Sequence, residues 1–217
     1  MSKMTAKLVG ILFTTAILTS LLGGGIIESI LDAPNYLANL PSNSTQIIFG
    51  FYLELITGIA VVGIVVMMFP ILKHHNTHLA LAFIVFRTIE SIFCIICAII
   101  PFLLLALSKE ATKSGNLNSD YIQSISSLLV IARSSMTNML IPIFFSLGAF
   151  SFYYIIYQSK LIPRYISVWG GIAVIMMLLV NLLKVNSSMT LLLAFPIILN
   201  ELYLGTWLFI KGFNKSL

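Results

Sequence analysis

An almost unbroken apolar run from Leu79 to Leu107 carries Arg87 and Glu90 in its first half. The run exceeds the roughly 20 helical residues that cross a bilayer core. A helix of this kind cannot present an arginine and a glutamate to lipid, because charge inside a membrane is costly. We therefore expect the rest of the chain to surround this pair.

The composition indicates a membrane protein. Of the 217 residues, 59% are hydrophobic and only 9% are charged, whereas soluble domains carry about 25% charged residues. No polar stretch is long enough for a soluble domain, so we predict that residues 1–217 form a single integral membrane domain. The net charge of +5 does not indicate nucleic-acid binding, because no basic cluster is interleaved with aromatic residues. The expected partner is the lipid bilayer, not nucleic acid.

The apolar stretches predict an all-α, polytopic bundle of about six transmembrane helices. The first runs from Met1 past Leu22 through a triple glycine to Ile27 and has no cleavage site of the signal-peptide kind. The other spans are predicted over residues 46–69, 79–107, 136–157, 164–183 and 189–210. A short interfacial helix over 35–40 and a polar loop over 108–120 are also expected.

A serine-rich segment, 121–135, precedes the fourth span. A single helix over 121–157 would be about 55 Å long, which exceeds a hydrocarbon core of about 30 Å. We therefore expect the leading segment to pack on the bundle or to lie partly outside the membrane.

The basic residues predict the orientation. With the N-terminus inside, seven lysines and arginines fall on the inner segments and three on the outer ones. The inner set is Lys3, Lys7, Lys73, Lys160, Arg164, Lys211 and Lys215, and the outer set is Lys109, Lys113 and Lys184. Because cytoplasmic loops carry the excess of basic residues, both termini are predicted to be cytoplasmic.

Five ionisable residues lie in or beside the spans: Glu54, Arg87, Glu90, Arg133 and Glu201. Helical rise places the three glutamates and Arg87 in one central slab of the membrane, whereas Arg133 lies either deep or at the outer rim. Arg87 and Glu90 are neighbours on one helical face. If Arg133 is deep, three carboxylates face two arginines, and the surplus carboxylate can be protonated.

These five residues are candidate ligand-binding residues. Intramembrane ionisable groups mark ion pathways or ligand sites by default. We expect the protein to bind or translocate a small polar or ionic species, with the glutamates as proton- or cation-binding groups. The alternative is a non-catalytic structural or accessory protein, because polar side chains also join membrane helices. The oligomeric state is left open.

The sequence offers no convincing catalytic or metal-binding set. Cys94 and Cys97 form a C-x-x-C inside an apolar helix, where small buried residues are a better interpretation than a redox motif with an accessible thiolate. His74 and His78 have a spacing that could chelate zinc, but no carboxylate or cysteine joins them. The serines have no histidine or lysine beside them in the membrane. We expect no cofactor or metal, and enzymatic activity is disfavoured.

Three motifs resemble those of a known family. They are Phe86-Arg87-x-x-Glu90, then Leu161-Ile162-Pro163-Arg164 leading to Trp169-Gly170, and Pro196-x-x-x-x-Glu201-Leu202-x-x-Gly205-Thr206-Trp207. In this order the chain resembles, over nearly its whole length, the bacterial membrane proteins of domain-of-unknown-function family 4386. The resemblance implies a small polytopic protein of the bacterial cytoplasmic membrane, with Glu54, Arg87, Glu90 and Glu201 at the family's intramembrane polar positions. It implies no reaction, and it does not extend to the surroundings of Arg133.

Overall fold

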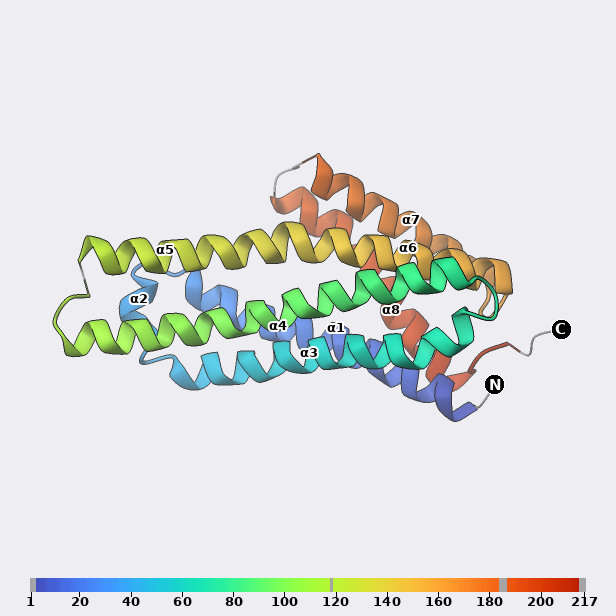
Figure 1. Cartoon of the computed structure of the whole chain (residues 1–217), viewed down its shortest axis with the longest axis horizontal. Coiled ribbons are helices and arrows are strands. Elements are labelled where there is room, and N and C mark those ends of the chain that lie inside the picture. Colours follow the sequence, from blue (N-terminus) through green and yellow to red (C-terminus); the bar gives the residue numbers. More distant parts are fainter. Residues whose placement is uncertain (1–2, 118, 184–186, 215–217) are drawn as a thin grey trace.

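The computed structural model of the chain describes residues 3–117, 119–183 and 187–214, and these are almost entirely helical, with no strand among them. The elements are α1 (Lys3–Leu31), α2 (Tyr36–Asn39), α3 (Ser44–Leu72), α4 (Thr77–Lys113), α5 (Asp120–Ser135), the π-helical turn η1 (Met136–Leu140), α6 (Ile141–Ser159), α7 (Arg164–Leu182) and α8 (Ser187–Ile210) (Figure 1). Six helices are long and apolar enough to cross a membrane when α5, η1 and α6 are taken as one. The predicted all-α bundle of six spans is confirmed, and the chain is a multi-pass membrane protein.

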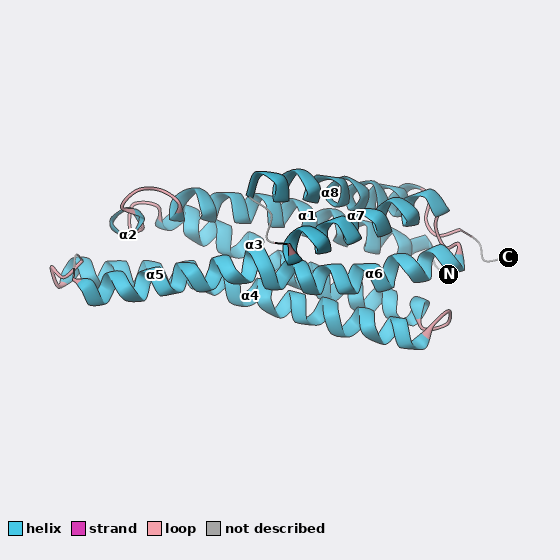
Figure 2. Ribbon diagram, turned by 90° about the horizontal axis from the view of Figure 1, so that it is seen from above, coloured by secondary structure: helices cyan, strands magenta, loops and turns pink. Residues whose placement is uncertain are grey.

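Two helices are much longer than a bilayer core requires. α4 continues past the expected end at Leu107 to Lys113, and α5, η1 and α6 form one helix from Asp120 to Ser159 (Figure 2). At 1.5 Å per residue these helices are about 55 and 60 Å long. The expected loop over 108–120 is therefore wrong in its first half. The reason is tertiary: Ser108 is fully buried and donates a hydrogen bond of 2.6 Å to the carbonyl of Leu37.

The leading segment of the fourth span packs against the bundle. Apolar side chains of α5, among them Ile122, Leu129 and Val130, pack against a cluster of buried residues to which α1, α2, α3 and α4 contribute. The segment is thus part of the folded core, which is one of the two places expected for it.

The spanning helices form a closed ring. Each packs against the next in the order α1, α3, α4, α6, α7 and α8, and α8 packs against α1. Short connections make successive helices antiparallel, so α1 begins and α8 ends at the same end of the bundle (Figure 1). Because α7 has only 19 residues and α4 has 37, the ring is complete only in the half that holds the two termini.

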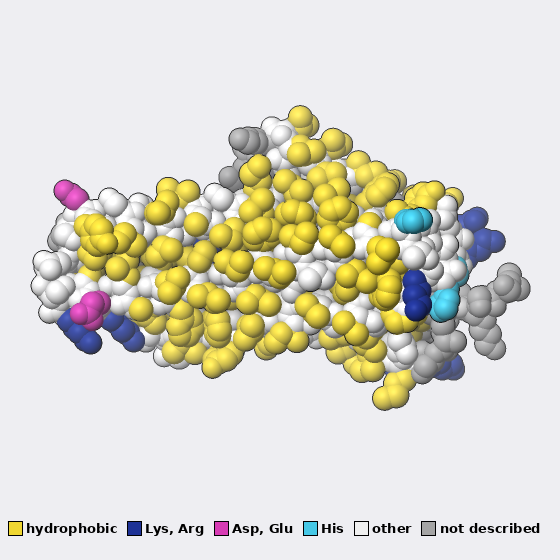
Figure 3. Space-filling model, in the orientation of Figure 1, with side chains coloured by type: hydrophobic (Ala, Val, Ile, Leu, Met, Phe, Trp, Pro, Cys, Tyr) yellow, Lys and Arg dark blue, Asp and Glu magenta, His cyan; other side chains and the backbone are white. Residues whose placement is uncertain are grey.

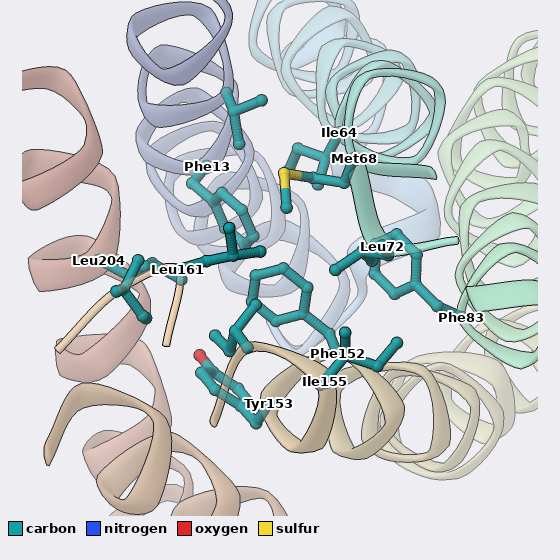
Figure 4. Packing of buried hydrophobic residues seen from close by; sticks show 14 of the residues in the cluster. Phe13, Ile64, Met68, Leu72, Phe83, Phe152, Tyr153, Ile155, Leu161 and Leu204 are labelled. Atoms are coloured by element: carbon teal, nitrogen blue, oxygen red, sulfur yellow. The ribbon is translucent and has the colours of Figure 1, made fainter. Parts of the chain in front are cut away.

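Two apolar cores occupy the two halves. The core near the termini joins all six spanning helices and includes Phe13, Met68, Phe83, Phe152 and Leu204 (Figure 4). The other core joins α1, α2, α3 and α4, and α5 packs against it. On α4 the first core ends at Phe83 and the second begins at Ile100. Arg87 and Glu90 lie between the two cores on that helix.

The outer surface of the bundle suits a lipid environment. Large apolar side chains such as Ile59, Val66 and Ile172 are more than half exposed. Figure 3 shows a hydrophobic middle, with lysines, arginines, acidic residues and histidines gathered toward the two ends. The orientation of the two ends relative to the cytoplasm stays a prediction.

Candidate functional site

A cavity of about 220 Å³ lies between the helices of the ring and is lined by residues of α1, α3, α4, α6, α7 and α8. It far exceeds the roughly 10–15 Å³ that one water molecule needs. Most of its wall is apolar. Its polar and titratable side chains are Ser20, Thr57, Arg87, Glu90, Cys94 and Glu201. A mostly apolar cavity with a few convergent polar groups is typical of small-molecule sites.

Arg87 and Glu90 form an ion pair on the cavity wall. The Nη1 atom of Arg87 lies 2.9 Å from Oε2 of Glu90, and both residues are at least nine-tenths buried. The N–H groups are not well directed at the oxygen, so neither atom makes a hydrogen bond with any described residue. The guanidinium carbon lies 4.9 Å from the centre of the Phe145 ring, a cation–π distance. The opposite charges therefore lie close together, but Nη1 of Arg87 and Oε2 of Glu90 are still able to form hydrogen bonds.

α6 approaches α4 closely at Arg87 because residue 148 is glycine. A Cβ atom at Gly148 would lie 2.8 Å from Cγ and 2.9 Å from Cδ of Arg87. Such short contacts require either the arginine or the helix to move. The missing side chain at Gly148 thus fixes where the stem of Arg87 runs.

Glu201 is the carboxylate without a partner. It lines the cavity and is only 8% exposed, yet within the described part of the chain it forms no hydrogen bond and no ion pair. Its position depends on its neighbour Asn200, which accepts a 2.7 Å hydrogen bond from the Tyr153 hydroxyl and donates one of 3.0 Å to the Ile166 carbonyl. Gly170 leaves room for the Tyr153 ring, which a Cβ atom there would overlap. Contacts to α6 and α7 therefore set the rotation of α8 that turns Glu201 toward the cavity.

Glu54 and Arg133 form a separate pair that does not line the cavity. Nη1 of Arg133 donates to Oε2 of Glu54 at 3.0 Å and to the Cys97 carbonyl at 2.6 Å, and Nη2 donates to Oε1 of Glu54. Both side chains are buried. Glu54 precedes the cavity residue Thr57 by three positions, and Cys97 follows the cavity residue Cys94 by three. The pair thus lies about one helical turn from the cavity, on the side of the second core.

The structure thus divides the five candidate residues into two groups. Arg87, Glu90 and Glu201 meet at the cavity, whereas Glu54 and Arg133 bind each other. Arg133 lies deep, not at the outer rim, because α5 continues unbroken into the bundle. Among the described residues, three buried carboxylates face two buried arginines, and the surplus carboxylate is Glu201.

Several cavity residues were not predicted from the sequence. Cys94 could have been found, because it follows Glu90 by four positions and so lies on the same helical face. Phe145 gave no such signal. The π-helical turn could not be predicted from the sequence either. In this turn the N–H of Ile141 donates to the Met136 carbonyl, and the next residue on the cavity wall, Pro142, has no N–H to donate. Turns of this kind often occur at functional sites.

The cysteines and histidines form no further cluster. Cys94 and Cys97 are both free thiols, the first partly exposed and the second buried. In the residues that the structure describes, no three histidine, cysteine, aspartate or glutamate side chains are grouped so that they could hold a metal ion.

The chain matches the model of a known protein family. The family model described as a domain of unknown function, DUF4386, matches residues 8–212, which confirms the resemblance drawn from the three motifs. No curated protein and no solved structure matches the chain.

Proposed function

The chain belongs to the DUF4386 family, whose description assigns no activity, and we propose its function from the cavity: it binds or translocates a small polar or ionic species there. The observation that carries this proposal is Glu201, a buried carboxylate that faces the cavity and has no partner among the described residues. Removing an ion from water costs several kcal/mol even after the protein relaxes. A buried carboxylate without a partner is therefore expected at a site where a bound ligand or ion supplies that partner.

The cavity residues have distinct roles in this proposal. Glu201 and Glu90 hold a proton or a cationic group. Arg87 balances their charge and can also contact an anionic part of a ligand, because its Nη1 atom has no hydrogen-bond partner among the described residues. Glu54 and Arg133, which lie about one helical turn from the cavity, hold α3 and α5 together.

The proposed location is the bacterial cytoplasmic membrane, with both termini in the cytoplasm. The excess of lysine and arginine on the inner segments supports this orientation. The common end of α1 and α8 is consistent with it (Figure 1).

A structural role is the second candidate function. Its specific support is the Glu54–Arg133 pair, which joins α5 to α3 and, through the Cys97 carbonyl, to α4. If all five charged residues served only to hold the helices together, Glu201 would also stabilise the fold, and the binding of no solute would depend on Glu201.

Thermal unfolding of the purified full chain in detergent tests the proposal. Wild type, Glu201→Gln and the control Glu110→Gln are compared across pH and with a panel of salts and small polar solutes. Glu110 is an exposed carboxylate outside the cavity. A solute at about one hundred times its Kd adds roughly 2.7 kcal/mol of stability, which corresponds to about 5–10 °C for a chain of this length.

We expect such a shift in wild type and in Glu110→Gln, and its loss in Glu201→Gln. The proposal is refuted if two results occur together. The first is that no solute and no change of pH shifts the unfolding temperature of wild type differently from that of Glu201→Gln. The second is that the substitution itself lowers the unfolding temperature by several degrees, which would show that the carboxylate is structural.

A further inference from the structure

We propose that the ligand of this cavity is a small organic ammonium ion, with its cationic head at Glu201 and its apolar body against the rest of the wall. This inference rests on the proposed function and names the class of its ligand. Three features carry it: the sign of the charge, the number of oxygen ligands and the apolar wall.

The sign of the charge favours a cation. The cavity is lined by one arginine and two glutamates. Arg87 lies in an ion pair with Glu90, so two carboxylates share one arginine and Glu201 has no cation of its own among the described residues of the wall. An anion would meet the surplus carboxylate in a site of low dielectric, where like charges repel strongly. A cationic group supplies the partner that the described residues do not.

The oxygen count disfavours a calcium or magnesium ion. Calcium takes six to eight oxygen ligands and magnesium requires an octahedral set. The polar wall offers two carboxylates and the hydroxyls of Ser20 and Thr57. The Thr57 hydroxyl donates to the Leu53 carbonyl at 3.1 Å and lies 2.8 Å from the Thr19 hydroxyl, so only part of its accepting capacity is free. An ammonium group needs only a few acceptors, which the carboxylates and Ser20 can provide.

The apolar wall favours a ligand with a hydrocarbon body. Ile17, Val61, Met177, Ile197 and Ile198 line the cavity beside the charged groups. A bare proton or hydrated ion would leave these side chains against water, whereas an alkyl or aryl body removes that apolar surface from water. Leu21 also lines the cavity and is half exposed at the bundle surface. One wall of the cavity therefore reaches the lipid-facing surface, from which an amphiphilic amine can enter.

Isothermal titration of the full chain in detergent at neutral pH tests this assignment with four probes. They are benzylamine, which is cationic, its neutral analogue benzyl alcohol, its anionic analogue benzoate, and sodium chloride. We expect benzylamine to bind wild type at least about tenfold more tightly than benzyl alcohol or benzoate, because only the ammonium group of the amine forms an ion pair with Glu201.

Two cavity variants and one control locate the binding. Glu201→Gln should raise the Kd for benzylamine about tenfold or more, because the charged acceptor is lost. Ala194→Leu should also weaken binding, because it fills the cavity without changing its charge. Glu110→Gln, at an exposed position outside the cavity, should bind as wild type does. The Ala194 variant keeps the test decisive if Glu201→Gln does not fold.

Each other outcome overturns the inference. Equal binding of benzyl alcohol would show that the head charge is irrelevant, and benzylamine binding unaffected by either cavity variant would place the amine elsewhere. Binding of benzoate or sodium that depends on Glu201 would replace the ammonium class and leave the proposed function standing. Binding of none of the four probes would refute the ammonium assignment, and the wider thermal panel would then decide the proposed function separately.

Discussion

The Glu54–Arg133 pair makes a quantitative prediction about stability. Arg133→Met would leave the Glu54 carboxylate buried without its partner, and Glu54→Leu would leave the guanidinium with only the Cys97 carbonyl. The double variant replaces both charged side chains by apolar ones. Because the two residues lie 79 positions apart in the chain, any coupling between them arises from tertiary contact.

The magnitude follows from the geometry. Two N–H groups of Arg133 bind the two carboxylate oxygens of Glu54, and both residues are about nine-tenths buried or more. Removing one partner of such a pair destabilises a protein by about 3–5 kcal/mol, whereas replacing both by apolar residues is often neutral. We therefore expect each single variant to lose about 3–5 kcal/mol and the double variant to lose less than either one.

Reversible unfolding in mixed detergent micelles, followed by circular dichroism, measures these losses. Losses that simply add in the double variant would refute the reasoning, since independent sites behave in that way. Single losses below about 1 kcal/mol would also refute it, because such values are typical of solvated ion pairs. The double variant should still bind the cavity ligand, because neither residue lines the cavity.

Two further predictions concern the cavity wall. Gly148→Ala should destabilise the protein by about 1–3 kcal/mol, the usual range for overpacking, because the new Cβ atom meets the stem of Arg87. Gly171→Ala, where a Cβ atom meets nothing within 4 Å, is the control in the same unfolding assay, and equal effects would contradict the assignment. Methyl methanethiosulfonate should modify Cys94 before Cys97, because Cys94 lines the cavity whereas Cys97 is only 2% exposed. Peptide mass spectrometry over time gives the order, and faster labelling of Cys97 would contradict the cavity position of Cys94.

The sequence by itself determined the helices and one charged pair. Each span is a local property, because a run of apolar residues longer than the bilayer core specifies a membrane helix whatever its neighbours are. The Arg87–Glu90 pair is equally local, since residues three apart on a helix face the same way. The same locality explains why three short motifs were enough to indicate the family.

Tertiary structure alone decided which charges meet. The sequence left open whether Arg133 is deep or at the rim. In the structure α5 continues into the bundle, where Arg133 forms an ion pair with Glu54 of α3. That pairing removes Glu54 from the set of cavity residues, and no spacing along the chain encodes it. Glu201 is left unpaired for the same reason: Asn200, Tyr153 and Ile166, on three different helices, set the rotation of α8.

Helix length was likewise decided by contacts between elements. The polar residues after Leu107 predicted a loop, yet α4 continues because buried Ser108 donates its hydrogen bond to Leu37 and Ala111 is buried. A polar side chain favours a loop only while water is its best partner. Once packing supplies a carbonyl acceptor, the same side chain can remain inside a helix, and the sequence alone does not reveal that acceptor.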